Sequence, residues 1–217
     1  GDDSAEHIAL VDDLPQLNTP RRNFSLLRLA DGTLFVSGGF DAQGKPLSST
    51  EQLKPGGSSW KKDPKLQLTV ARGFHSATLL SSGDVLLIGG LSAGGQATGV
   101  IERFSPDEQT IKAEEQLNTE RWGHTASLLR DGRVLVVGGF GGGVAGEPTR
   151  EVDVISFTST GALQDPKQPF RLREPRGGHA ATVLPSGFLL ITGGVTVDCT
   201  SAPCVKRASG SAEVFVY

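Results

Sequence analysis

The stretch HTASLLRDGRVLVVGG, residues 124–139, recurs in four versions along this chain of 217 residues. The other three are FSLLRLADGTLFVSGG at 24–39, HSATLLSSGDVLLIGG at 75–90 and HAATVLPSGFLLITGG at 179–194. Their first residues are 51, 49 and 55 positions apart, and each version ends in a glycine pair. Internal repeats of this length are typical of solenoids and propellers, in which each repeat forms one packing unit. The repeat therefore indicates the architecture before any other feature.

Further residues recur at fixed distances from each block. An arginine stands three residues before it, and an acidic residue follows it after a variable insert. The arginines are Arg21, Arg72, Arg121 and Arg176, and the acidic residues are Glu51, Glu102, Asp153 and Glu213. The glycine pairs are Gly38, Gly39, Gly89, Gly90, Gly138, Gly139, Gly193 and Gly194. Two glycines at a strand end allow a sharp turn and a close backbone approach, as the crowded inner ends of blades require. A phosphate-binding loop is the alternative, but no helical pattern or P-loop lysine follows any pair.

Each block predicts a β-hairpin, because an Asp-Gly or Ser-Gly turn separates two apolar runs. The acidic residue lies in an expected third strand, and a weaker fourth follows, for example at 110–115. Four short strands per repeat are what a propeller blade needs. We therefore predict an all-β, single-domain β-propeller over residues 1–217, with four blades of four antiparallel strands. The blades are expected at 21–67, 72–116, 121–171 and 176–217, with 8–14 added to the last and 1–6 as a flexible tail.

These residues resemble the kelch repeat family in the recurring arginine, the block-start histidine and the glycine pair. The core pattern is most similar to bacterial kelch variants, and the resemblance covers essentially residues 8–217. The family's aromatic position holds Leu53, Phe104, Ile155 and Phe215, so tyrosine is missing there. The resemblance implies a propeller fold, and it also extends to copper-radical oxidases of the galactose-oxidase type.

The ends of the chain suggest how the ring closes. The last repeat ends within its third strand at Tyr217, and residues 7–21 align with 110–121 of the second repeat. We therefore expect residues 8–14 to pair with 212–217 as the outer strand of the last blade, which removes an exposed strand edge. A ring shared by two chains, and a piece of a larger propeller, are the alternatives.

Composition excludes several classes of function. The net charge is −3 without a basic cluster, so nucleic acid is not an expected partner. No apolar run reaches the roughly 20 residues of a membrane span. Cys199 and Cys204 lie in one insert and predict a small-loop disulfide, with two reduced thiols as the alternative. A disulfide would place the protein outside the cytoplasm, at the cell surface, in the periplasm or secreted.

Three histidines share the first position of the block: His75, His124 and His179, with Phe24 in the first repeat. Inward-pointing imidazoles related by rotation could converge on a metal ion. The favoured interpretation is that each histidine packs between blades and hydrogen-bonds a neighbouring backbone. The recurring arginines likewise have two interpretations: paired charges that tie the blades together, or a ring that binds anions.

Catalytic motifs are missing from the sequence. A galactose-oxidase-like site would need active-site tyrosines, and the one tyrosine is Tyr217. We therefore expect a non-catalytic binding or structural module without a cofactor. It would engage a protein or a glycan through the inserts after the glycine pairs, at 40–49, 91–99, 140–150 and 195–211. These inserts are expected on one face of the ring, where repeat scaffolds commonly carry function. A carbohydrate-binding propeller is the first alternative and a galactose-oxidase-like enzyme the second.

Overall fold

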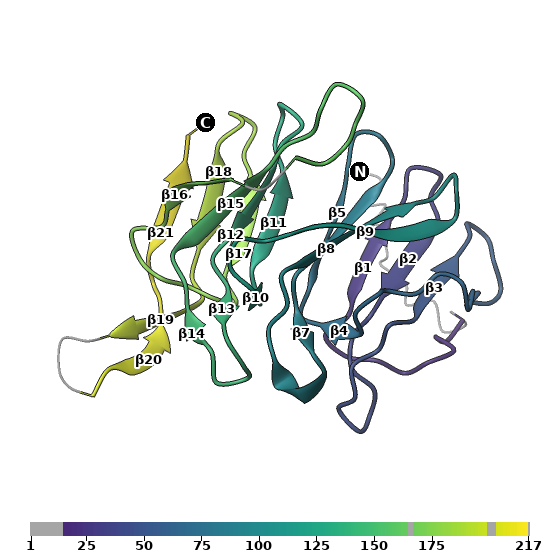
Figure 1. The fold of residues 1–217 in the computed structure, drawn as a ribbon, viewed down its shortest axis with the longest axis horizontal. Helices are drawn as coiled ribbons and strands as arrows, with labels where there is room; N and C mark the ends of the chain where they lie inside the picture. Colours follow the sequence, from purple (N-terminus) through teal and green to yellow (C-terminus); the bar gives the residue numbers. More distant parts are fainter. Residues whose placement is uncertain (1–14, 165–166, 199–202, 217) are drawn as a thin grey trace, which may run out of the picture.

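The chain folds into a row of small antiparallel sheets (Figure 1). The computed structural model describes residues 15–164, 167–198 and 203–216. In these ranges one short 3-10 turn, Ala93–Gly95, interrupts an otherwise all-β architecture, and no helix is long and apolar enough to cross a membrane. The all-β class predicted from the repeat is confirmed.

Four sheets correspond to the four repeats. The first consists of β1 (Ser25–Arg28), β2 (Leu34–Ser37) and β3 (Thr50–Leu53). The second consists of β5 (Ser76–Leu79), β6 (Val85–Ile88), β8 (Val100–Ser105) and β9 (Thr110–Gln116). The third consists of β11 (Thr125–Leu128), β12 (Val134–Val137), β15 (Glu151–Ile155) and β16 (Lys167–Arg171). The fourth consists of β17 (Ala180–Val183), β18 (Leu189–Thr192) and β21 (Ala212–Phe215).

The expected fourth strand does not form in the first sheet. In its place the described chain makes two isolated bridges, Gln52 with Lys61 and Ser49 with Gln67. The intervening sequence KPGGSSWKKDP contains two prolines, which lack the N–H that a sheet ladder needs, and a glycine pair that weakens a strand. In the fourth sheet the predicted closing strand, 8–14, lies outside the described residues. Closure of the ring within the chain therefore stays a prediction.

The inserts carry their own small ribbons. β4 (Arg72–Gly73) pairs with β7 (Leu91–Ser92), and β19 (Val195–Asp198) pairs with β20 (Val205–Ala208). Between them lie β10 (Arg121–Trp122), β13 (Phe140–Gly141) and β14 (Glu147–Pro148). All of these ribbons extend from the same, lower side of the sheets in Figure 1. We call this side the insert face.

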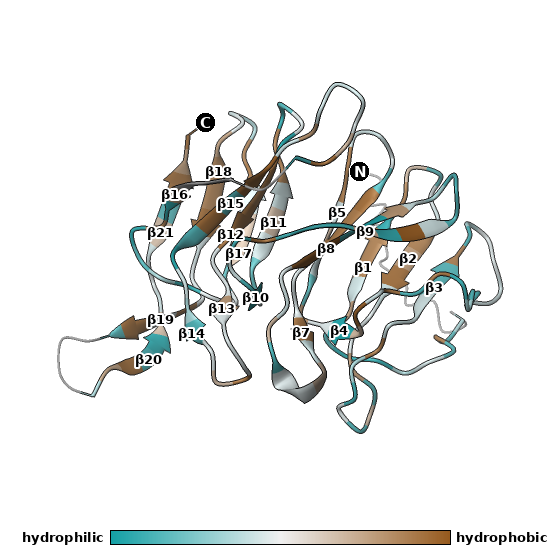
Figure 2. Cartoon of the chain, in the orientation of Figure 1, coloured by the Kyte–Doolittle hydropathy of each residue, from teal (hydrophilic) through white to brown (hydrophobic). Residues whose placement is uncertain are grey.

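The sheets pack face to face, so apolar clusters form between them. The innermost strands lie side by side in the order β1, β5, β11 and β17, with the first and fourth sheets at opposite ends of the row (Figure 1). Strand β6 is buried on both faces: Val85 and Leu87 pack toward the first sheet, whereas Leu86 and Ile88 pack toward the third. Double burial explains why this strand, like β12, is a continuous apolar run (Figure 2).

Candidate functional site

The recurring arginines lie against the recurring carboxylates of their own sheets. The guanidinium nitrogens lie 2.7 Å from the carboxylate in Arg21–Glu51, 2.5 Å in Arg72–Glu102 and 3.0 Å in Arg176–Glu213. Arg121 contacts Asp153 in the same way. All four guanidinium groups are fully buried. Each pair fastens the segment before the block to the third strand, where a buried charge finds its partner.

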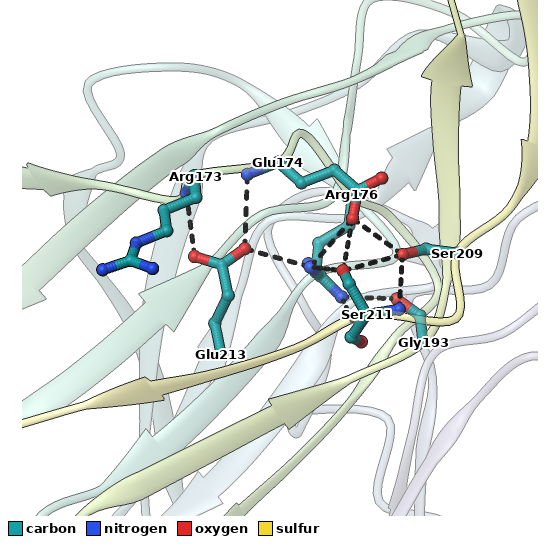
Figure 3. A network of polar contacts seen from close by, with 7 residues as sticks. All are labelled: Arg173, Glu174, Arg176, Gly193, Ser209, Ser211 and Glu213. Atoms are coloured by element: carbon teal, nitrogen blue, oxygen red, sulfur yellow. Dashed lines mark hydrogen bonds and ion pairs between the residues drawn. The ribbon is translucent and has the colours of Figure 1, made fainter.

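The fourth sheet shows how these couples are extended (Figure 3). The Arg176 guanidinium donates to the Ser211 carbonyl at 3.2 Å and to Glu213 Oε1 at 3.0 Å. Glu213 also accepts the backbone N–H groups of Arg173, at 2.8 Å, and Glu174, at 3.2 Å. The carboxylate therefore clamps the chain that leads to the arginine as well as the arginine itself.

The first sheet repeats this clamp. Glu51 accepts the backbone N–H of Asn18 at 2.7 Å and that of Thr19 at 3.0 Å. Burial alone would raise the pKa of the Glu51 carboxyl, but hydrogen bonds from Asn18, Arg21 and Thr19 outweigh it and hold the pKa below its ordinary value. Burial lowers the pKa of Arg121 to about 10, which leaves the guanidinium charged at neutral pH. The charges of these buried arginines are therefore paired within the protein, and this arrangement disfavours a site for an external anion.

Three of these arginines, Arg72, Arg121 and Arg176, also link their own sheet to the sheet before it. The second glycine of a pair donates its N–H to the carbonyl of the next arginine: Gly39 to Arg72 at 2.8 Å, Gly90 to Arg121 at 2.9 Å and Gly139 to Arg176 at 2.8 Å. The close approach explains the glycines. A Cβ added to Gly138 would lie 2.4 Å from the Arg176 carbonyl oxygen, which real Cβ atoms do not tolerate.

The three block-start histidines do not converge. Each Nε2 instead reaches a hydroxyl on the innermost strand of the preceding sheet: His75 to Ser25 at 2.9 Å, His124 to Ser76 at 3.0 Å and His179 to Thr125 at 2.9 Å. His75 also bonds Ser37 at 2.9 Å. The partners are side-chain hydroxyls, so the expected backbone partner is wrong, although the position between sheets is as predicted.

Burial and the neighbouring arginines keep these histidines neutral. Burial is the larger cause, and it lowers the pKa of His75 and His124 to about 3 and that of His179 to about 4. Their Nε2 atoms are occupied by hydroxyls, and no group of three or more histidine, cysteine or acidic residues in the described part of the chain is placed to hold a metal. The geometry favours a packing role over a metal-ligand or acid–base role.

A fourth recurring contact was not anticipated from the sequence. The residue before each block start, Asn23, Phe74, Gly123 or Gly178, has a left-handed backbone with φ between 53° and 62°. Its N–H donates to the carbonyl of the same position in the preceding sheet: Phe74 to Asn23 at 2.9 Å, Gly123 to Phe74 at 3.1 Å and Gly178 to Gly123 at 2.8 Å. Asparagine and two glycines at this position were the available signal, because these residues favour positive φ.

A row of aromatic rings crosses from the first to the third repeat. The ring centroids are 5.8 Å apart in Phe40–Phe74, 5.2 Å in Phe74–Trp122 and 4.6 Å in Trp122–Phe140. Phe40 and Phe140 are buried, whereas Phe74 and Trp122 are half-buried. Arg22 lies over the Phe40 ring at 5.8 Å. The repeat does not predict this row, because Phe74 lies one residue before its block start and Trp122 lies two residues before its own.

Neighbouring inserts are joined sideways. Ala97 of the second insert donates its N–H to the Gly142 carbonyl at 3.0 Å. Lys206 of the fourth insert donates to the carbonyls of Ala145 and Gly146, both at 2.8 Å. Apolar side chains nevertheless remain outside, with Val144 69% and Val205 55% exposed. The insert face thus combines fixed backbones with exposed apolar groups.

A polar pocket of about 340 Å³ lies away from the insert face, between β8, β9 and the loop around Gly161. Arg103 dominates it and is held by Asp84 at 3.2 Å, Glu114 at 3.0 Å and the Phe157 ring at 5.4 Å. The arginine charge is balanced within the pocket. Cys199 and Tyr217 lie outside the described residues, so the disulfide and the lack of a copper-radical site both stay predictions.

Comparison with known proteins supports the fold. No protein-family model matches the chain, and no curated protein sequence matches it. The structure is similar to "Structure of YjhT", a kelch-repeat β-propeller protein, with a TM-score of 0.74 at 15% sequence identity. The match covers 90% of this chain and 68% of the YjhT chain. The kelch-like β-propeller fold is therefore confirmed, whereas the number of blades in a complete ring is not.

Proposed function

We propose that this chain is a non-catalytic, extracytoplasmic binding module that engages a protein partner through the insert face. The observation that carries the proposal is the lateral joining of the second, third and fourth inserts through Ala97, Gly142 and Lys206. A surface that is ordered before it binds loses less conformational entropy on association. Function on a repeat scaffold commonly lies where loops vary and the framework is constant.

The fate of the recurring polar residues supports the same conclusion. Each recurring arginine is paired with a carboxylate of its own sheet, and each block-start histidine is neutral and bonded through Nε2 to a hydroxyl. The accessible groups of the insert face include Val144 and Val205 beside Lys206, together with the half-buried Trp122. Apolar and aromatic groups rimmed by charge are typical of protein-binding surfaces.

Site-specific photo-crosslinking tests this proposal. A benzophenone side chain at Val144 lies on the insert face, and the matched control is the same group at Ser81, an exposed position at a hairpin turn. We expect a protein partner captured from Val144 and not from Ser81, and we expect Val144→Asp to weaken binding of the purified partner. Equal capture from both positions, or unchanged binding by Val144→Asp, would contradict the proposal.

A glycan ligand is the second candidate, and the half-buried Trp122 ring beside Phe74 favours it. A partly accessible aromatic ring offers an apolar surface next to polar groups. Binding on a glycan array that is lost in Trp122→Leu and kept in Val144→Asp would replace a protein by a glycan. An oxidase of the copper-radical type is the third candidate, and copper analysis of the purified protein tests it.

The extracytoplasmic location rests on the predicted Cys199–Cys204 disulfide. Mass spectrometry of unreduced peptides is expected to show the two cysteines linked. Two free thiols in protein purified from its natural source would contradict this part of the proposal.

A further inference from the structure

The free faces of the first and fourth sheets are complementary halves of one sheet-to-sheet junction. Each of the three interior junctions contains the same three polar contacts: a glycine N–H to an arginine carbonyl, a left-handed residue's N–H to the preceding carbonyl, and a histidine to a hydroxyl. An apolar cluster fills the rest of each junction. These contacts give a junction a direction, because the two sheets contribute different groups.

The two ends of the row each present the unmatched half of the first two contacts. On the fourth sheet, Gly194 N–H and the Gly178 carbonyl have no hydrogen-bond partner among the described residues. On the first sheet, the Arg21 carbonyl and Asn23 N–H are likewise unmatched in the described part of the chain. The missing bonds are thus Gly194 N–H to Arg21 and Asn23 N–H to Gly178, with donors and acceptors on the required sides.

In the third contact, the histidine and the hydroxyl are both replaced by apolar residues at the ends of the row. Where the interior junctions have a histidine, the first sheet has Phe24; where they have a hydroxyl, the fourth sheet has Ala180. A histidine facing Ala180 would lose its hydrogen bond, whereas a phenylalanine needs none. The receiving space is also open, because a Cβ on Gly193 would meet only the Ser209 carbonyl, at 3.8 Å.

Apolar side chains complete both free faces. On the fourth sheet Val214 is 50% exposed and is paired through β18 with Leu190, whose equivalents Leu86 and Leu135 are buried in the interior junctions. On the first sheet Leu26 is 55% exposed. Since these faces lie at opposite ends of the row, they do not cover each other in this structure (Figure 1).

We propose that a second copy of this chain completes the ring, with the fourth sheet of each copy packed on the first sheet of the other. The interface continues the two backbone contacts and the apolar packing of the interior junctions, with Phe24 facing Ala180 in place of the histidine–hydroxyl bond. Two copies joined head to tail form two such junctions and close a ring of eight sheets, within the usual propeller range of about 4–8 blades.

Sedimentation velocity tests the proposal directly. The wild-type protein is expected to sediment as a dimer, with twice the chain mass of 22.7 kDa. Leu26→Lys and Val214→Asp each place a charge in both junctions, so we expect association to weaken by about a hundredfold or more. Val144→Asp, at a position that is also exposed but lies on the insert face, is the control and should leave the mass doubled.

Mixing the two variants tests the direction of the interface. An equimolar mixture of Leu26→Lys and Val214→Asp contains one junction with both wild-type faces, so it is expected to recover pairing that neither variant shows alone. Circular dichroism melts establish that both variants are folded. A single-copy mass for the wild type, open chains longer than two, or no recovery on mixing would overturn the proposal.

Discussion

The junction between the third and fourth sheets and the free face of the fourth sheet are built from the same repeat, yet they differ at nearly every contact position. In the junction a Cβ on Gly138 would collide with the Arg176 carbonyl and lie 2.9 Å from the His179 ring, whereas Gly193 has open space. Thr125 bonds His179, whereas the equivalent Ala180 is exposed and has no hydroxyl. The comparison shows that the residue type and the packing at a repeat position depend on the neighbouring sheet as much as on the residue's own sheet.

Acid sensitivity should show the largest effect. The histidines in the junctions have pKa values of about 3 to 4 when folded, compared with about 6.5 unfolded, so unfolding takes up protons below pH 6.5. Their stabilising contribution is fully present above that pH and is lost as pH falls. With three protons the slope approaches about 4 kcal/mol per pH unit near pH 5, and Glu51 adds in the same direction. Urea unfolding at pH 7, 6 and 5 measures this loss of stability. Equal free energies of unfolding at the three pH values would contradict the prediction.

The arginine–carboxylate pairs should show the second-largest effect on stability. Arg121→Ala removes the cationic partner of the fully buried Asp153, which keeps its hydrogen bonds from Asn118, and is expected to cost on the order of 3–5 kcal/mol. Arg176→Ala in the end sheet should cost less, about 1–3 kcal/mol, because Glu213 and Glu174 reach solvent. Denaturant midpoints compare the two.

Lysine sharpens this test. Arg121→Lys should restore only part of the loss, since an ammonium group lacks the planar fork that reaches both the carboxylate and the Glu151 carbonyl. A denaturant midpoint for Arg121→Ala within error of wild type would refute the structural role of this arginine. It would favour the alternative, a ring of arginines that binds anions.

The glycines offer a closely matched pair. Gly138 and Gly193 both have positive φ, 58° and 68°, so alanine should cost each about 1–2 kcal/mol of backbone strain. Gly138→Ala should cost a further 1–3 kcal/mol, on the order of other overpacked substitutions, because of its contacts in the junction. Both are compared in a Val214→Asp background, which keeps the fourth sheet's face free. Equal losses of unfolding free energy in the two variants would show that the close contacts around Gly138 in the junction do not affect stability.

The smallest expected effect concerns the histidine–hydroxyl bond. His124→Phe combined with Ser76→Ala imitates the Phe24 and Ala180 combination of the chain ends. Each single change should cost about 1 kcal/mol, and the double variant less than their sum, because neither polar group is then left unpaired. Strict additivity in a double-mutant cycle would mean that the bond contributes nothing.

The sequence predicts the features that repeat within one sheet. The hairpins, the third strands and the glycine pairs follow from local spacing, and the structure places Arg121 beside Asp153 in the same way. Contacts between sheets were harder to predict, because the repeat does not tell which column of the next sheet lies opposite. Ser25, Ser76 and Thr125 directly follow the block start, but their pairing with a histidine one repeat later becomes clear only in three dimensions.

Two further differences have local causes. The first sheet's outer strand was predicted from the repeat, yet the prolines and glycines at 54–64 prevent it. Phe74 adopts φ of 54°, which no propensity suggests for an aromatic residue; the bond from its N–H to Asn23 and packing against Trp122 hold it there.

The central claim is that the recurring histidines are neutral junction residues and neither metal ligands nor acid–base groups. An NMR titration of the histidine Cε1–H signals tests it most directly, with His7 identified by its loss in His7→Gln and set aside. We predict that the signals of His75, His124 and His179 keep their neutral positions from pH 8 to about pH 5 and do not change when zinc is added. Titration of these signals with midpoints near 6.5, or a zinc-induced shift of all three, would contradict the account.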